Sequence, residues 1–81
     1  MAHTKSSIKI IVKLFAMLRR GRFDQSVIEG DESMVVRHVV TMLNIPEKEA
    51  AILFINSRHA ELDTVLHEGD ALAIFPPVGG G

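Results

Sequence analysis

Residues 8–15 read IKIIVKLF, an alternating run rich in β-branched side chains that predicts a β-strand. Because successive side chains of a strand point to opposite faces, every second residue from Ile8 falls on one apolar face. That face must lie in the core, and it consists of Ile8, Ile10, Val12 and Leu14. The opposite face mixes charge with two large apolar groups, and it consists of Lys9, Ile11, Lys13 and Phe15.

The residues on either side of this strand predict a loose arm before it and a hairpin after it. Residues 1–7 are polar and are expected to form a flexible N-terminal arm. Residues 19–22, with the sequence RRGR, predict a turn, and residues 23–28 a weaker strand that returns beside the first. The arginines of this turn are expected to be solvated, with contact to an acidic partner as the alternative; they are Arg19, Arg20 and Arg22.

One helix is predicted from about Met34 to Asn44. Its apolar residues recur at i, i+3, i+4 and i+7, which makes one stripe along a helix. They are Val36, Val39, Val40 and Leu43. Asp31 or Ser33 is the predicted N-cap, and Pro46 is predicted to end the helix. Since valine is a mediocre helix former, packing against a sheet must hold this helix in place.

Two further strands are predicted in the second half of the chain. Residues 52–55 form a short apolar strand, followed by a turn at residues 56–57. Leu62 and Leu66 are expected core anchors in an irregular connection, and residues 68–70 form another turn. In the last strand, residues 71–75, Leu72 and Ile74 should face inward. The order β-β-α-β-β predicts an α+β roll with one main helix across one face of a sheet.

Length and composition exclude several classes of protein. A chain of 81 residues makes one domain, and the absence of cysteine excludes disulfides, thiolate metal sites and a side-chain thiol nucleophile. Nine basic against ten acidic residues argue against a nucleic-acid binder, which needs a basic surface. No apolar run is long enough to cross a membrane, and no signal peptide is visible, so a cytoplasmic protein is expected. The four histidines lack metal-ligand spacing, and no metal site is expected.

Three segments resemble the MoaD/ThiS family of ubiquitin-like sulfur carriers. Residues 14–19, LFAMLR, look like the exit of the first strand of MoaD, the small subunit of molybdopterin synthase. Residues 55–56, 62–66 and 68–70 are similar to the family's third strand and turn region, whereas the polar residues 57–59 depart from the apolar partner-facing group expected in a molybdopterin synthase subunit. The ending FPPVGGG resembles the family tail FPPVxGG. The resemblance runs from about residue 8 to the last residue and implies a β-grasp fold with a mixed sheet, with residues 8–75 as the domain and residues 76–81 as an extended glycine tail.

The resemblance implies that the working group is the carboxylate of Gly81. In such carriers an E1-like enzyme adenylates the terminal carboxylate with ATP, and a sulfur donor then displaces AMP to leave a thiocarboxylate. Gly81 would carry covalent cargo, with no cofactor bound to the chain itself. The residues expected to thread the partner's active site are Pro76, Pro77, Val78, Gly79 and Gly80. Glycine has no Cβ to clash in a narrow channel, and proline cannot join a sheet edge; a frayed glycine end is the alternative.

Phe15 and Phe75 predict a docking surface beside this tail. In a β-grasp sheet the first and last strands are parallel neighbours, so both rings should lie on the face away from the helix, beside Ile11 and Ala73. Scattered apolar surface residues are ordinary and form the alternative. Two aromatic side chains next to a reactive tail favour a docking patch.

Three classes of function stay open at this point. The leading hypothesis is a sulfur carrier, with the small subunit of molybdopterin (or tungstopterin) synthase ahead of carriers for thiamin, tRNA thiolation or cysteine synthesis. Its partners would be an E1-like adenylating enzyme and a large, MoaE-like synthase subunit or an equivalent acceptor enzyme. The second class is a ubiquitin-like modifier joined to lysines, and the third is an interaction module without terminal chemistry. The chain is not expected to be catalytic alone, or to bind nucleic acid or a membrane.

Overall fold

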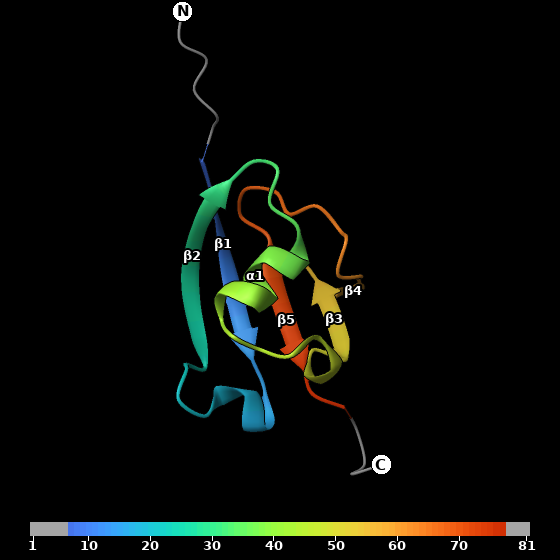
Figure 1. Ribbon diagram of the computed structural model, residues 1–81. Helices are drawn as coiled ribbons and strands as arrows, with labels where there is room; N and C mark the ends of the chain where they lie inside the picture. The colour runs from blue at the N-terminus through green and yellow to red at the C-terminus, as the bar shows by residue number, and fades with distance from the viewer. Residues whose placement is uncertain (1–6, 78–81) are drawn as a thin grey trace, which may run out of the picture.

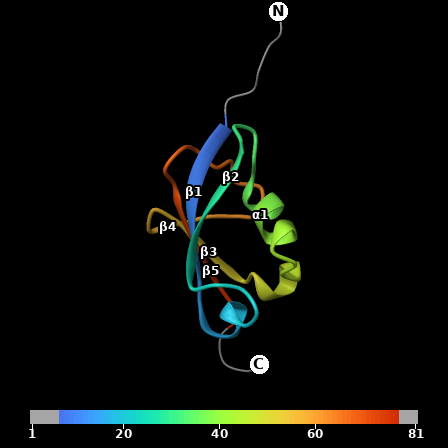
Figure 2. The ribbon, with the colours of Figure 1, turned by 90° about the vertical axis from the view of Figure 1, so that its left-hand side faces the viewer.

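Five strands pair into one mixed sheet in the computed structural model of the protein, which describes residues 7–77. They are β1 (Ser7–Leu14), β2 (Gln25–Asp31), β3 (Ile52–Ile55), β4 (Arg58–His59) and β5 (Ala71–Phe75). The order across the sheet is β2-β1-β5-β3-β4, with β1 and β5 parallel and the other neighbours antiparallel. Helix α1 (Val36–Met42) lies on one face of this sheet (Figures 1 and 2). The predicted β-grasp fold is therefore confirmed, with β4 as an additional short strand.

Alternation along β1 decides where the core lies, as predicted. Its inward side chains and those of β5 meet the stripe of α1 between sheet and helix. The fully buried side chains of these three elements are Ile10, Val12, Leu14, Leu72, Ile74, Val36, Val39 and Val40. Leu66 is also fully buried, whereas Leu43 and Leu62 are partly buried against the same cluster. None of the helices within residues 7–77 is long and apolar enough to span a membrane.

The connection between β1 and β2 differs from the predicted simple turn. The chain forms a 3₁₀ helix, η1 (Ala16–Arg19), and β2 starts two residues later than predicted and continues to Asp31. η1 places Leu18 in the core with 1% of its surface exposed. Ala16 has φ +54°, a left-handed conformation that non-glycine residues rarely adopt, and it turns the chain out of the strand. Ser7, the last residue of the predicted arm, is the first residue of β1. The rest of that arm, residues 1–6, lies outside the described residues.

The start of α1 corrects the predicted N-cap. The cap position is Val35. The Asp31 carboxylate does not cap the helix but accepts two hydrogen bonds from Ser33, one from the backbone nitrogen of Ser33 at 2.8 Å and one from its Oγ at 2.6 Å. Backbone carbonyls of a distant loop take over the capping role. The backbone N–H of Val36 donates to the Thr64 carbonyl at 3.1 Å, and the next N–H of the helix donates to the Leu62 carbonyl at 2.8 Å. Two of the four N–H groups that a helix leaves without an intrahelical partner are therefore satisfied by tertiary contacts.

The end of α1 also differs from the prediction, since the helix stops at Met42 and not at Pro46. Asn44 has φ +57° and follows the C-cap, a position where asparagine commonly ends a helix. Pro46 lies beyond it and begins a second 3₁₀ turn, η2 (Glu47–Glu49). Across the helix, the Arg37 guanidinium pairs with Asp63 and Glu47, and these bonds raise the pKa of Arg37 above its ordinary value.

Arg22 is a structural residue, which corrects the prediction that all three turn arginines are solvated. Its guanidinium donates to three backbone carbonyls, those of Leu43 at 3.0 Å, Leu18 at 3.0 Å and Asn44 at 3.1 Å. These bonds join the η1 loop to the C-terminal end of α1, where carbonyls lack helical partners. Arg20 makes no such bond and is exposed.

We expect Arg22→Ala to lower the free energy of unfolding by roughly 1–3 kcal/mol, because three carbonyls lose a charged donor. Arg20→Ala is the matched control, and it should change stability by less than about 0.5 kcal/mol. Urea unfolding of both variants measures the difference. Equal midpoints for the two variants would show that the guanidinium does not hold the loop.

Candidate functional site

The face of the sheet opposite α1, called the outer face below, brings together residues from four strands. Cross-strand pairing aligns Lys13 with Ala73, Ala73 with Phe54, and Phe54 with His59. The next row toward the C-terminal end of β5 pairs Phe75 with Ile52. Since paired residues share a face, these side chains line one continuous surface.

Aromatic rings concentrate at one end of this outer face. The rings of Phe15 and Phe75 are stacked, with centroids 4.1 Å apart and planes inclined by 8°. Phe54 meets Phe75 edge to face at 5.9 Å, and His59 meets Phe54 in the same way at 6.0 Å. We call these four residues the aromatic patch. The Arg19 guanidinium lies 5.5 Å from the centre of the Phe15 ring, within the range of a cation–π contact.

The predicted pairing of Phe15 with Phe75 on this face is therefore observed. Ala73 lies in the next row, and Ile11 shares the face farther from the rings, opposite Ala71 in the register. Phe54 and His59 were not predicted. Alternation along β3 around the buried Leu53 would have placed Phe54 outward, but a run of four apolar residues gives no clear period.

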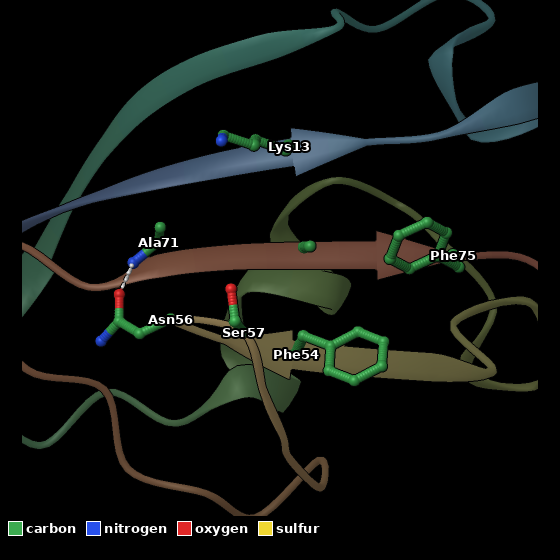
Figure 3. A pocket seen from close by; sticks show the side chains of 7 residues that line it. Lys13, Phe54, Asn56, Ser57, Ala71 and Phe75 are labelled. Atoms are coloured by element: carbon green, nitrogen blue, oxygen red, sulfur yellow. Dashed lines mark hydrogen bonds between the residues drawn. The ribbon is translucent and has the colours of Figure 1, made fainter.

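A hollow of about 340 Å³ opens beside the rings (Figure 3). Ala71 and Ala73 of β5 line its floor with side chains that end at Cβ, and the larger rings of Phe54 and Phe75 also line the hollow. The remaining lining residues are Lys13, Asn56 and Ser57. The hollow is open to solvent and mainly apolar, so it offers a place for a side chain of another molecule.

Hydrogen bonds at the turn after β3 fix the position of β5 beneath this hollow. The Asn56 side chain accepts from the backbone N–H of Ala71 at 3.0 Å (Figure 3). It also donates to the Asp70 carboxylate at 2.9 Å. The other Asp70 oxygen accepts from the backbone N–H of His67 at 2.8 Å, and only 13% of the Asp70 side chain is exposed. Asn56 and Ser57 have positive φ, which suits a tight hairpin turn and confirms the predicted turn.

The chain leaves the sheet directly beside the aromatic patch. The Phe75 carbonyl accepts the N–H of Ala51 at 3.0 Å, and Pro76 and Pro77 then follow outside any strand. Neither proline has an N–H to donate, so the exit cannot extend the strand. The other predicted tail residues, Val78, Gly79, Gly80 and Gly81, lie outside the described residues.

The described residues offer an apolar and aromatic surface for binding on the outer face. Within residues 7–77 no group of His, Asp or Glu side chains could hold a metal ion. Their side chains also leave no buried polar atom without a hydrogen-bond partner.

A β-grasp sheet with an uncovered aromatic face and a proline-led exit defines a ubiquitin-like domain. The chain belongs to the ThiS family, which it matches over residues 12–81. Comparison with curated proteins found no match.

Solved structures of similar proteins include subunits of molybdopterin-converting factors and small archaeal modifier proteins. A protein from Pyrococcus furiosus assigned as molybdopterin converting factor, subunit 1, is 28% identical with a TM-score of 0.69, covering 88% of this chain and 99% of its own. Small archaeal modifier protein 1 of Haloferax volcanii is 26% identical with a TM-score of 0.70, and the match covers 88% of this chain and 99% of the modifier. Subunit 1 in the complex of both subunits of molybdopterin-converting factor from Helicobacter pylori, at 22% identity and a TM-score of 0.61, covers 91% and 100% and shares the fold.

Proposed function

We propose that this protein is a sulfur carrier whose Gly81 carboxylate is converted to a thiocarboxylate, and that it serves as the small subunit of a molybdopterin synthase. The observation that carries the proposal is the position of the exit. β5 ends at Phe75, whose ring belongs to the aromatic patch, and the chain continues through two prolines toward three glycines. A partner that covers the patch thus receives the tail at the edge of the same contact.

Activation in the cytoplasm needs two steps, adenylation by the E1-like enzyme and displacement of AMP by a sulfur donor. A carboxylate oxygen of Gly81 attacks the α-phosphorus of ATP, and pyrophosphate leaves. A sulfur nucleophile at the oxidation level of sulfide then attacks the acyl carbon, and the bond to AMP breaks. The product is a thiocarboxylate on the carrier, so the carrier acts as a co-substrate and supplies no catalytic side chain.

Belonging to the ThiS family and sharing 28% identity with the Pyrococcus furiosus subunit support this role. A large synthase subunit would then accept the sulfur. Carriers for thiamin, tRNA thiolation and cysteine synthesis use the same terminal chemistry and stay as alternatives within the class. A protein modifier is the second candidate, because the archaeal modifier matches about as well at 26% identity.

Intact mass spectrometry tests the proposal directly. The full chain is incubated with the E1-like enzyme of the same organism, ATP and sulfide, and the carrier should gain the mass difference between sulfur and oxygen. Omitting ATP is the control. Isopeptide adducts on lysines with no gain of sulfur would favour the modifier, and transfer from the thiocarboxylate to a pterin precursor by a large synthase subunit would fix the pathway.

Phe75→Ala should weaken binding of the activating enzyme by roughly 1–3 kcal/mol, as aromatic hot-spot residues do. The variant loses its stacking with Phe15 and its edge contact with Phe54, yet its ring is only half buried in the isolated protein. Leu72→Ala is the control, since it empties the core and should cost stability by roughly 2–5 kcal/mol. Isothermal titration and thermal unfolding separate the two effects. Unchanged affinity for Phe75→Ala would remove the aromatic patch from the docking surface.

A further inference from the structure

Lys13 lines the hollow beside the aromatic patch together with six uncharged residues. The register places it between Gln25 of β2 and Ala73 of β5, so neither cross-strand neighbour is negative. Across the described part of the chain, no carboxylate lies within 4.0 Å of its ammonium. The hollow therefore combines an apolar floor with a cation that has no carboxylate partner among residues 7–77.

Other cations of this region differ from Lys13 in having acidic neighbours. Lys9, two residues earlier on the same face of β1, pairs in the register with Glu29. Arg19, beside the aromatic patch, lies 3.5 Å from the Asp24 carboxylate. Of the two lysines of β1, Lys13 is thus the one whose cross-strand neighbours are both uncharged.

We propose that Lys13 and the hollow bind an apolar side chain flanked by a carboxylate on the surface of the activating enzyme. This inference rests on the proposed function, because every pathway through the terminal carboxylate requires that enzyme. The hollow is close in volume to the smallest ligand pockets, which begin at about 300 Å³, and it has room for one large side chain. The alanines of its floor leave the depth that such a side chain needs.

The carboxylate follows from the cost of covering a cation. An enzyme that covers Phe54 and Phe75 also covers the Lys13 stem, since all three line the same hollow. An ammonium enclosed without a counter-charge is strongly unfavourable. A carboxylate beside the inserted side chain removes this penalty and adds electrostatic complementarity, which gives specificity among partners.

The test measures binding of the full-length carrier to the purified E1-like enzyme of the same organism at low and high salt. Lys13→Glu should weaken binding at low salt by at least about tenfold, and Lys13→Gln by less. Wild-type affinity should fall with salt more steeply than that of Lys13→Gln, because the variant has lost the ion pair. Lys9→Glu is the matched control and should stay within about threefold of wild type. Thermal unfolding confirms that the variants are folded.

The outcomes separate this inference from the proposed function. If Lys13→Glu binds like wild type while Phe75→Ala binds weakly, the carboxylate contact is excluded and the docking surface stands. Equal losses for Lys13→Glu and Lys9→Glu would indicate general steering by charge, which also overturns the inference. Recovery of Lys13→Glu by an acidic-to-lysine substitution in the enzyme would establish the pair. Failure of the wild-type chain to gain sulfur would overturn the proposed function instead.

Discussion

Deleting Gly81 should abolish thiocarboxylate formation while leaving the fold unchanged. The deletion keeps a terminal carboxylate, now on Gly80, but withdraws it by one residue from a site that must align it with the α-phosphorus of ATP. Misplacement by far less than one residue is enough to cost orders of magnitude in rate. Intact mass after incubation with the activating enzyme, ATP and sulfide should show no sulfur gain above the control without ATP.

Two companion variants test whether activation depends on the position of the terminal carboxylate and not only on its presence. Adding one residue after Gly81 moves the carboxylate outward and should abolish activation as the deletion does. Gly79→Ala keeps the length and the terminal pair. Although Gly79 is among the residues expected to thread the partner's active site, it fills the variable position of the family tail, where a side chain is accommodated, so the variant should remain a substrate. Thermal stability should be within about 0.5 kcal/mol of wild type for all three, since terminal residues contribute little to a core. Sulfur gain at the wild-type rate by the deletion or the extension would exclude the terminal carboxylate as the working group.

The sequence predicted the fold well because two of its periodic patterns are unambiguous. Alternation in residues 8–15 and the helical spacing from Val36 to Leu43 each define one buried face, and burying both faces against each other leaves few arrangements. Glycine and asparagine marked the turns correctly at Asn56 and Gly69, both of which have positive φ. Such local signals are independent of tertiary structure, which is why they could be recognised in advance.

Features that depend on distant contacts were missed. The α1 N-cap was assigned to the nearest polar residues, whereas carbonyls of residues 62 and 64 satisfy the helix N–H groups. Arg22 looked like an ordinary surface charge until the fold placed three carbonyls around it. β4 has only two polar residues and is defined by its pairing with β3. No local pattern carries this information.

The candidate site was likewise predictable only where local patterns define it. The stacking of Phe15 on Phe75 followed from alternation once the two strands were assumed to be parallel neighbours, and that assumption came from the family resemblance. Phe54 and the hollow required the register of β3 against β5, which sets a ring beside two alanines. The significance of Lys13 emerged only when its cross-strand neighbours proved to be uncharged.

Val40→Asp should remove most of the stability of the fold. Val40 is fully buried between α1 and the sheet, and no described side chain around it offers a counter-charge, because the buried cluster is entirely apolar. An uncompensated buried carboxylate costs roughly 3–5 kcal/mol, and a domain of this size has a total stability near the lower end of about 5–15 kcal/mol. Protonation of the aspartate would relieve part of the penalty, so the variant should be least stable at neutral pH and recover somewhat in acid.

Thr41→Asp provides the control for this substitution because it adds the same charge one residue later on the exposed side of α1. An acidic residue in the last turn of a helix is unfavourable by only about 0.3–1 kcal/mol, so this variant should remain folded. Urea unfolding followed by circular dichroism at two pH values measures both variants. Wild-type stability for Val40→Asp would mean that the helix does not pack through its valine stripe, and the outer face would lose its rigid support: the same sheet that buries Val40 on one side carries the aromatic patch on the other.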